Sequence, residues 1–362
     1  MSKLPKLRPS IRSVAQRAGV SVATVSRIVN GMHGRASQDT VLKVKQAVAA
    51  LDYRPQSAGR ALRQRESRIV GVLVANLGNP AMAAIAASIE AALRAHGYVM
   101  ALCDTHEDPE IQDEYLREME AQLARVIVMV VAVPSPMLDQ LRQVGRPLVF
   151  VNRRDPGNPL SCFVGIDDLA AGRAVGAFCL QERFTHPAVL HASVRYSAGA
   201  LRLRGIREEM SAAGWCLERI PDYSAPDLRH VDIGYHAAAS AMAAEPGTDA
   251  LLCLSDLLAY GAYRWVCEHL TPNARHPRLI SFDGNPLNDS ISPWLTSIRL
   301  PYEELGTGVV QALEDCLGGV AQPEYLLPFQ LVVRDAYPAG AVRQTKIASG
   351  RPAPAVFQTP QG

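Results

Sequence analysis

The chain lacks the features that mark membrane-bound and secreted proteins. Its 362 residues contain no run of about 18 uncharged apolar residues, whereas a membrane-spanning helix needs about 20. The first residues also lack a basic region followed by an apolar stretch, which is the pattern of a secretory signal. We therefore expect a cytoplasmic protein without a membrane partner.

Metal-binding spacing and enzyme motifs are missing as well. The seven cysteines are scattered singly, without the C-x-x-C or Cys/His spacing of a zinc site, and most lie in apolar runs. We expect reduced core thiols, no metal and no cofactor. The chain also has no G-x-G-x-x-G, P-loop, G-x-S-x-G or H-E-x-x-H pattern. The sequence thus predicts a protein that is not an enzyme; because open α/β folds host many activities, an enzyme is the main alternative.

Charge is present but unevenly distributed. Residues 1–68 hold 14 Lys and Arg against three Asp and Glu, a net charge of +11. Residues 69–362 hold 23 against 32, a net charge of −9. A basic head on an acidic body is typical of a module that neutralises phosphates, so this segregation favours nucleic acid as a partner.

The basic head shows the pattern of a helix-turn-helix. Three serines can cap three helices: Ser10, Ser21 and Ser37. Gly19 can end the first helix in the left-handed conformation, and the small Ala15 lets the first two helices cross closely. Apolar spacing turns part of the second helix toward the first and leaves the rest outward: Val22, Ala23, Thr24, Ser26 and Arg27. A recognition helix presents such residues to the major groove of DNA. A helical hairpin without a DNA role is the alternative.

A short basic linker follows the third helix, which we expect to end near Leu51. Residues 51–63 read LDYRPQSAGRALR, a segment too short to be a stable helix alone. Together with the helix-turn-helix and the body, this linker resembles the lactose and purine repressor family of bacterial transcription regulators. The resemblance runs from about Ile11 to Tyr337.

The resemblance implies a set of DNA-binding residues. In the family the linker becomes a hinge helix in the minor groove, where a leucine wedges into the central base step; by position this is Leu62. Ordinary packing of Leu62 is the alternative. The family usually has Asn where this chain has Gln56. The implied residues are Val22, Ala23, Thr24, Ser26 and Arg27 in the head, and Tyr53, Gln56, Leu62 and Arg63 in the linker.

From Arg68 onward, strand-like runs alternate with helical stretches. The expected strands are rich in Val, Ile and Leu: 69–74, 98–103, 126–133, 148–151, 163–166, 188–191, 250–254 and 279–282. Continuous apolar runs between amphipathic helices indicate parallel sheets that are covered on both faces. Two such sheets fit the length of the chain better than one.

The body resembles the fold of periplasmic sugar-binding proteins, in which two α/β lobes enclose the ligand. The resemblance places 69–166 and 294–328 in the first lobe, and 167–293 with a strand near 331–334 in the second. The expected fold class is α/β, with an N-terminal helix-turn-helix domain and a two-lobed periplasmic-binding-protein-like core of parallel sheets. The expected domains are a DNA-binding head (1–53), a hinge helix (54–67), an effector-binding and dimerisation core (68–340) and a disordered tail (341–362).

Unusual polar residues follow several of these strands, at the edge where open α/β sheets bind ligands. The family's Arg-x-x-Gly signature matches Arg202, whose donor fork suits vicinal hydroxyls or a carboxylate. Asp283 matches an acceptor of ligand hydroxyls, and Asp256 is expected to cap a helix after Ser255. The resemblance implies these effector-binding residues: Asn79, Met82, Asn152, Arg202, Tyr223, Ser255, Asp283 and Tyr302.

Structural roles are open for several of these residues. They are a strand-to-helix turn for Asn79, a surface position for Arg202, core packing for Tyr223 and a turn cap for Asp283. Tyr302 is expected to close the cleft. The chain has Asn152 and Ser255 where the family commonly has Asp and Asn, which changes the available hydrogen bonds.

These patterns together predict a ligand-controlled transcription factor, most simply a repressor of carbohydrate-metabolism genes at the nucleoid. It would bind a near-palindromic, double-stranded DNA operator as a homodimer. A tetramer is left open, although no leucine-heptad tail favours it. The expected effector is a small sugar or sugar acid, acting as inducer or as corepressor. A periplasmic binding protein is excluded in practice by the basic head and the missing signal.

Overall fold

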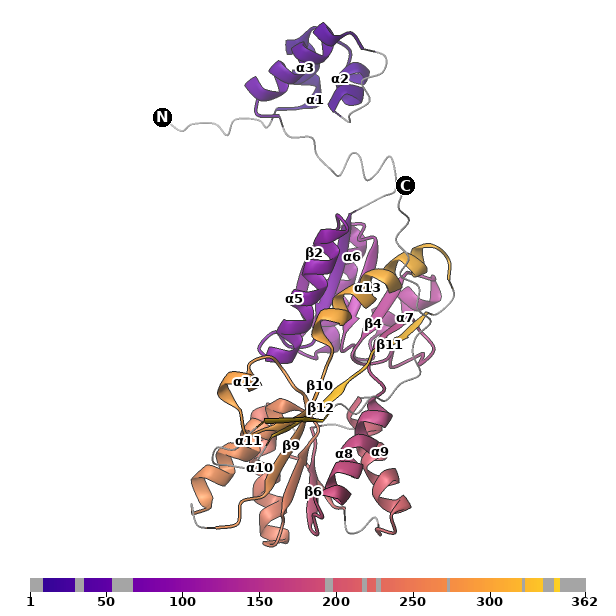
Figure 1. Cartoon of the computed structure of the whole chain (residues 1–362). Coiled ribbons are helices and arrows are strands. Elements are labelled where there is room, and N and C mark those ends of the chain that lie inside the picture. Colours follow the sequence, from indigo (N-terminus) through magenta and orange to yellow (C-terminus); the bar gives the residue numbers. More distant parts are fainter. Residues whose placement is uncertain are drawn as a thin grey trace. The chain divides into compact units, whose positions relative to one another are not determined.

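The structure is a computed structural model of the chain. It describes residues 9–29, 36–53, 68–192, 198–216, 220–225, 229–271, 274–320, 323–334 and 342–345. The chain divides into two compact units, Met1–Ser67 and Arg68–Gly362. Each unit is described by itself below (Figure 1).

Three helices build the described part of the first unit: α1 (Ile11–Ala18), α2 (Val22–Val29) and α3 (Gln38–Ala50). Ser10 caps α1 by accepting the backbone N–H of Ser13, and Gly19 ends the helix with φ of 66°. Ser37 caps α3 by accepting the N–H of Thr40. The helices enclose a small core of buried residues: Val14, Ala15, Val25, Ile28, Val44 and Ala47. The predicted helix-turn-helix is confirmed.

The second unit consists of two α/β lobes, and the first is built on a six-stranded sheet in the order β11-β5-β4-β3-β1-β2 (Figure 1). Its strands are β1 (Ile69–Val74), β2 (Val99–Asp104), β3 (Val126–Val130), β4 (Leu148–Val151), β5 (Phe163–Gly165) and β11 (Glu324–Leu326). All of its pairings are parallel. Its helices are α5 (Pro80–Ala95), α6 (Pro109–Ala121), α7 (Pro136–Gln143) and α13 (Tyr302–Leu317). The strands β1, β3 and β4 are almost wholly buried, as continuous apolar runs predict.

The second lobe is built on a seven-stranded sheet in the order β13-β12-β10-β9-β8-β6-β7. Its strands are β6 (Pro187–Leu190), β7 (Asp222–Tyr223), β8 (Ala250–Cys253), β9 (Arg278–Asp283), β10 (Thr296–Arg299), β12 (Gln330–Arg334) and β13 (Val342–Thr345). Its helices are α8 (Asp168–Gln181), α9 (Ala198–Ala212), α10 (His230–Ala244), α11 (Asp256–His269) and α12 (Asn288–Ile291). The strand β12 runs antiparallel to both of its neighbours. The other pairings are parallel.

The chain crosses between the lobes after β5, after β10 and after β11. The two-lobed fold with parallel sheets is therefore confirmed. Three segments of the chain thus cross the junction of the lobes.

Two expectations about the body are wrong in detail. The sequence predicts residues 294–300 in the first lobe, but β10 pairs with β9 and β12 in the second sheet. The buried side chains of Thr296, Ser297 and Ile298 suit this interior position, so the chain returns to the first lobe only at α13. The expected disordered tail, 341–362, contains β13, which pairs with β12. The rest of that tail lies outside the described residues.

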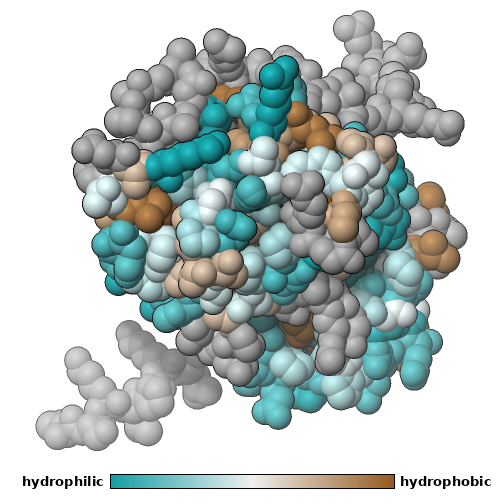
Figure 2. Space-filling view, turned by 90° about the horizontal axis from the view of Figure 1, so that it is seen from below, coloured by the Kyte–Doolittle hydropathy of each residue, from teal (hydrophilic) through white to brown (hydrophobic). Residues whose placement is uncertain are grey.

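The surface at the end of the second lobe is largely hydrophilic (Figure 2). Figure 2 shows small, separate apolar areas among hydrophilic residues on this face. Such scattered apolar residues are normal on a protein surface that faces water. Within the described ranges, no helix combines the length and the apolar character needed to cross a membrane.

Candidate functional site

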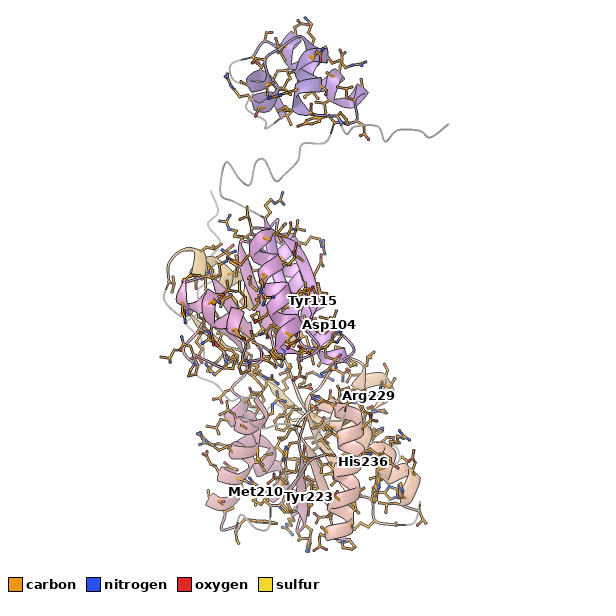
Figure 3. All side chains as sticks on the ribbon, turned by 180° about the vertical axis from the view of Figure 1, so that it is seen from behind. Asp104, Tyr115, Met210, Tyr223, Arg229 and His236 are labelled. Atoms are coloured by element: carbon orange, nitrogen blue, oxygen red, sulfur yellow. The ribbon has the colours of Figure 1, made fainter. Side chains whose placement is uncertain are left out.

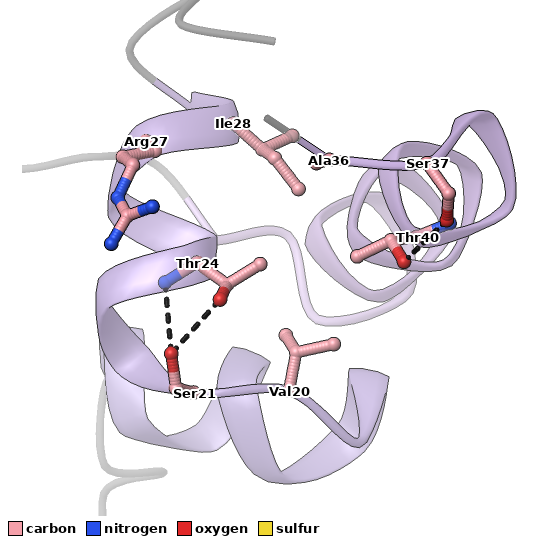
Figure 4. Close-up of a pocket in the computed structure, with 8 residues that line it drawn as sticks. All are labelled: Val20, Ser21, Thr24, Arg27, Ile28, Ala36, Ser37 and Thr40. Carbon is pink, nitrogen blue, oxygen red and sulfur yellow. Dashed lines mark hydrogen bonds between the residues drawn. The ribbon is translucent and has the colours of Figure 1, made fainter. Parts of the chain in front are cut away.

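The outward face of α2 is the first candidate site (Figure 4). The Ser21 hydroxyl accepts the backbone N–H of Thr24 at 3.1 Å and lies 2.9 Å from the Thr24 hydroxyl, which fixes the first turn of the helix. The two apolar residues that anchor α2, Val25 and Ile28, are buried. The structure thus leaves the predicted contact residues at or near the surface, three exposed and two half-buried: Val22, Ala23, Arg27, Thr24 and Ser26.

A hollow of about 360 Å³ lies where α2 and α3 begin (Figure 4). Two capping serines, Ser21 and Ser37, lie in its wall together with Arg27. The N-terminal ends of helices carry free N–H groups and a partial positive charge, which favour anions such as DNA phosphates. The arrangement can therefore place a phosphate beside the residues that would meet base edges.

The linker residues have mixed outcomes. Tyr53 is half-buried and packs against the core of the head. Gln56, Leu62 and Arg63 lie outside the described residues, so their DNA contacts stay predictions.

The second candidate site is a cavity of about 120 Å³ between the lobes of the second unit. A cavity needs roughly 10–15 Å³ to hold one water molecule, so this cavity can hold a small polar molecule. It lies where strands from both sheets end, next to β1, β4, β6, β8 and β9: Ala75, Asn152, His191, Leu254 and Asp283. Figure 3 shows Asp104 of the first lobe and Arg229 of the second on opposite sides of this junction. The structure brings six predicted effector residues to the cavity: Asn79, Met82, Asn152, Arg202, Ser255 and Asp283.

Arg202 is the most tightly held of these residues. It projects from α9 and is only 4% exposed. Its Nε donates to Asp168 Oδ1 at 2.8 Å, and its Nη1 donates to the carbonyl oxygen of Leu254 at 2.8 Å. The same Nη1 lies 3.4 Å from Asp283 Oδ1, and the guanidinium lies over the ring of Phe282, 4.8 Å from its centroid. One buried cation is therefore held between two carboxylates.

Two glycines allow α8 and α9 to approach closely enough for this contact. A Cβ atom on Gly172 would lie 2.2 Å from the carbonyl oxygen of Arg202, and one on Gly205 would lie 2.2 Å from that of Leu169. Both distances are shorter than any real contact, so larger residues would push the helices apart. The Arg-x-x-Gly spacing thus has a physical reason: Gly205 provides the close packing that brings Arg202 beside Asp168 at the start of α8.

Burial controls the charge state of the two carboxylates. It raises the pKa of Asp283 to about 6, although Arg202 acts in the opposite direction. Burial also raises the pKa of Asp168, again opposed by Arg202. At neutral pH Asp283 is therefore an ionised acceptor that can receive hydrogen bonds from ligand hydroxyls.

The backbone at Asp283 is strained. Its φ is 94°, in the left-handed region that residues other than glycine rarely adopt. The hydroxyl of Tyr302 donates to the Asp283 carbonyl oxygen at 2.9 Å and so holds this turn in place. Tyr302 therefore stabilises this turn through its backbone, and it is not among the residues that line the cavity.

The expectation that Asp256 caps α11 is wrong. Ser255 is the cap, since its hydroxyl accepts the N–H of Leu258 at 3.4 Å, and Ser255 also lines the cavity. Asp256 is completely buried. Its carboxylate accepts hydrogen bonds from side chains of β9, β10, α12 and the turn before α12: Ser281, Ser297, Asn288 and Asn285. A buried carboxylate needs such partners, so Asp256 joins these elements and does not face the ligand.

The first-lobe wall is formed by turns after β1 and β4. Asn79 caps α5, because its Oδ1 accepts the N–H of Ala81 at 3.0 Å, and it also lines the cavity. Asp104 accepts the N–H of Leu77 at 2.9 Å and so fixes the turn before this cap. Asn152 lines the cavity with φ of 63°, another strained position at a strand end.

Tyr223 does not line the cavity. It belongs to β7, is half-buried and packs against the core of the unit. Its carbonyl oxygen accepts the N–H of His191 at 3.0 Å. The structure therefore gives Tyr223 the alternative role, core packing.

Four titratable residues of the cavity wall are not among the predicted effector residues: Glu107, Arg153, His191 and His230. Arg153 and His191 each follow a strand, so their positions could have indicated them. Glu107 lies in a turn and His230 begins α10, and neither position carries a sequence signal. Glu107 Oε2 lies 3.8 Å from Arg153 Nη2, and its Oε1 lies 3.8 Å from His230 Nε2 across the junction of the lobes.

Two family models match this chain. Residues 10–56 match the model described as bacterial regulatory proteins, lacI family, and residues 177–336 match a periplasmic binding protein-like domain. The ribose operon repressor of Halalkalibacterium halodurans is 26% identical over 344 residues, which cover 91% of this chain and 98% of that protein. The HTH-type transcriptional regulator GntR of Pseudomonas aeruginosa is 28% identical, with 91% and 96% covered.

Solved structures show the same fold. The lac repressor dimer bound to operator and an anti-inducer superimposes with a TM-score of 0.78 at 22% identity, covering 92% of this chain and all of that one. A complex of the transcriptional regulator CelR with cellobiose gives a TM-score of 0.66 at 25% identity, covering 91% of this chain and all of that one. The chain thus combines a lacI-family helix-turn-helix domain with a two-lobed core like that of periplasmic binding proteins.

Proposed function

We propose that this protein is a transcriptional repressor of carbohydrate-metabolism genes. It binds a near-palindromic operator as a homodimer, and a small sugar or sugar acid between the lobes controls that binding. The names of its relatives support this proposal, since they include a ribose operon repressor and a sucrose operon repressor. The protein acts on DNA in the cytoplasm as a regulator and not as an enzyme.

One observation carries the proposal. A chain with a basic helix-turn-helix also holds a polar cavity whose walls come from both lobes of its second unit. A ligand in that cavity contacts turns of two sheets at once. Because three crossings connect those sheets, any ligand that prefers one arrangement of the lobes shifts the population toward it.

The same argument links the ligand to the operator. If one arrangement of the lobes binds operator better than another, the ligand changes operator affinity, and the operator changes ligand affinity by the same factor. The sign of this coupling follows from which arrangement each partner prefers. An inducer and a corepressor are therefore two outcomes of one mechanism.

The dimer follows from the form of the target. One helix-turn-helix reads one half-site, so two heads related by a two-fold axis need an inverted repeat. A lac repressor structure that resembles this chain is described as a dimer bound to operator, which supports the homodimer.

Operator selection tests the DNA-binding half of the proposal. The full-length protein is incubated with a random duplex library, and the bound duplexes are sequenced over several rounds. We expect an inverted repeat, which the protein then binds in fluorescence anisotropy far more tightly than a scrambled duplex. Recovery of no common sequence would contradict the proposal.

Variants of α2 locate the base contacts. Thr24→Ala and Arg27→Ala should each weaken binding to the selected duplex by about 1–3 kcal/mol, because each removes a contact to a base edge. Lys43→Ala is the control: it removes a similar charge from α3, where Lys43 pairs with Asp39 at 2.7 Å, and it should leave base preference unchanged. Wild-type affinity and preference in both α2 variants would remove this face from the DNA contact.

A ligand screen tests the second half. Sugars and sugar acids that raise the melting temperature of the protein are added to the operator titration. We expect at least one to change operator affinity. If ligands bind without any effect on operator affinity, the proposal that the cavity controls DNA binding is contradicted.

A further inference from the structure

Arg153 differs from Arg202, although both line the same cavity. Arg153 follows β4 on the first-lobe wall, and its side chain is 18% exposed. Within the described residues, its polar contacts are the carbonyl oxygen of Ala132 at 3.5 Å and Glu107 Oε2 at 3.8 Å. Charge-assisted N–H···O bonds normally measure about 2.7–2.9 Å. The Arg153 guanidinium is thus held loosely beside the cavity.

A largely buried cation of this kind lacks compensation. Burial lowers the pKa of Arg153 from its ordinary value and the nearby charge of Arg202 lowers it further, while Glu107 and Asp168 oppose these effects only in part. The guanidinium still stays charged, because its ordinary pKa lies far above neutral pH. Removing a charge from water is costly unless close partners replace the water. An anion in the cavity would supply those partners.

Glu107 is the only acid within 4.0 Å of Arg153 in the described part of the chain, and it is a weak counter-ion. Its side chain is 36% exposed, and its carboxylate is shared with His230 on the other lobe. Both of its ion-pair distances are 3.8 Å, so moving it aside breaks no short bond. A ligand anion can replace Glu107 at Arg153, and His230 then offers a second donor from the second lobe.

We propose that the effector is a polyhydroxylated carboxylate whose acid group pairs with Arg153 while its hydroxyl groups meet Asp283 and Arg202. This inference rests on the proposed function, because it takes the cavity as the effector site. Arg202 is already neutralised by Asp168 and Asp283, so it serves as a fixed donor to hydroxyls. Within the described residues Arg153 has no carboxylate oxygen closer than 3.8 Å, so it is the cation with which a ligand anion can form a short pair.

A carboxylate fits this position better than a phosphate. A guanidinium fork and a carboxylate are both planar and can form two parallel hydrogen bonds. Glu107 already places one carboxylate oxygen 3.8 Å from Arg153 Nη2, so this side of the guanidinium is open to a carboxylate. A dianionic phosphate would bring a second charge next to Glu107 and Asp283.

Matched pairs of ligands test the inference. Isothermal titration calorimetry with the full-length protein compares D-gluconate with D-sorbitol, D-glucuronate with D-glucose, and D-galacturonate with D-galactose. Glucose 6-phosphate and inorganic phosphate are the phosphate arms. We expect at least one acid to bind at least about tenfold more tightly than its neutral partner, because hydrogen bonds to charged groups are the stronger ones.

Two variants locate the effect. Arg153→Gln keeps the size and some donors but removes the charge, and it should reduce the acid-to-neutral affinity ratio at least about tenfold. Arg153→Lys keeps the charge without the fork and should retain part of the preference. Arg154→Gln is the matched control, because Arg154 pairs with Glu324, lies over the ring of Phe163 and does not line the cavity. Circular dichroism checks the fold of each variant.

Several outcomes would overturn the inference. They are equal binding of an acid and its neutral partner, tighter binding of the phosphate arms, binding of no acid at all, or an equal loss for acid and neutral ligand in Arg153→Gln. The operator selection described above is independent of these titrations. A protein that selects an operator and binds neutral sugars as well as acids keeps the proposed function and loses this inference. A protein that prefers acids but selects no operator loses the proposed function alone.

Discussion

The two walls of the cavity each hold a buried arginine, but the polar contacts of these two arginines differ in length. On the second-lobe wall, Arg202 makes a 2.8 Å hydrogen bond to Asp168 and another to a carbonyl oxygen, and Asp283 adds a third contact. On the first-lobe wall, the contacts of Arg153 are 3.5 and 3.8 Å long. Arg202 therefore has short hydrogen-bond partners without a ligand, whereas Arg153 has only long contacts.

This difference separates two kinds of functional residue. Arg202 belongs to the fold as much as to the site, because the close packing of α8 on α9 depends on the same segment. Arg153 makes only long side-chain contacts in the described part of the chain, so we expect its main role to be in ligand binding. Stability measurements and ligand measurements should therefore give opposite rankings for the two arginines.

The largest expected effect is on stability. Arg202→Ala leaves two buried carboxylates without their cation, and we expect the free energy of unfolding to fall by about 3–5 kcal/mol. Arg153→Ala should cost less than about 1 kcal/mol, because its ion pair is long and partly exposed. Urea denaturation followed by tryptophan fluorescence measures both, since the three tryptophans lie at 215, 265 and 294 in the second lobe.

If Arg202 served only to bind ligand, Arg202→Ala would fold normally and lose only its response to ligand. The buried ion pairs contradict that simple expectation. Equal and small losses of stability in both variants would show that Arg202 and Arg153 contribute equally to the stability of the fold, which contradicts this prediction. The double variant Asp168→Asn, Arg202→Ala is the control for uncompensated charge, and it should recover part of the loss.

The second expected effect is on pH dependence. Since burial raises the pKa of Asp283 to about 6, this carboxyl group binds a proton more tightly in the folded protein than in the unfolded chain. Its contribution to stability is therefore full below about pH 4, the ordinary range of Asp, and is lost as the pH rises through about 6. Ligand binding should respond in the opposite direction, because hydroxyl groups need the ionised acceptor.

We expect ligand affinity to fall below about pH 6, by up to about tenfold per pH unit. Calorimetry from pH 7.5 to pH 5 with the tightest ligand of the screen measures this. Asp283→Asn should bind weakly at every pH and show no such step. A step that persists in Asp283→Asn would assign the titration to another group.

The difference between the two walls also explains which residues of the site could be predicted from the sequence. Arg202 and Asp283 could be predicted because the fold imposes a local pattern on each: a glycine three residues after Arg202, and a strand directly before Asp283. The pairing of Arg153, Glu107 and His230 has no local pattern, since the three residues come from separate turns and helix starts that meet only after folding. The same reason explains β10, whose sheet depends on which strand it meets, and the short strands β7 and β11, which have too few residues to show a period.

The smallest expected effect concerns Tyr302, for which the sequence suggested closure of the cleft. In the structure its hydroxyl donates to the carbonyl oxygen of Asp283 at 2.9 Å and supports the strained turn from behind. Tyr302→Phe removes that one hydrogen bond and should lower the free energy of unfolding by about 1 kcal/mol. Because the Asp283 carboxylate keeps its place in the cavity wall, ligand affinity should change by less than about threefold, which corresponds to roughly 0.6 kcal/mol.

Tyr325→Phe is the matched control, since Tyr325 donates its hydroxyl to Asp315 in the first lobe, outside the cavity. A tenfold or larger loss of ligand affinity in Tyr302→Phe, with unchanged stability, would instead place Tyr302 against the ligand and add the start of α13 to the cavity wall.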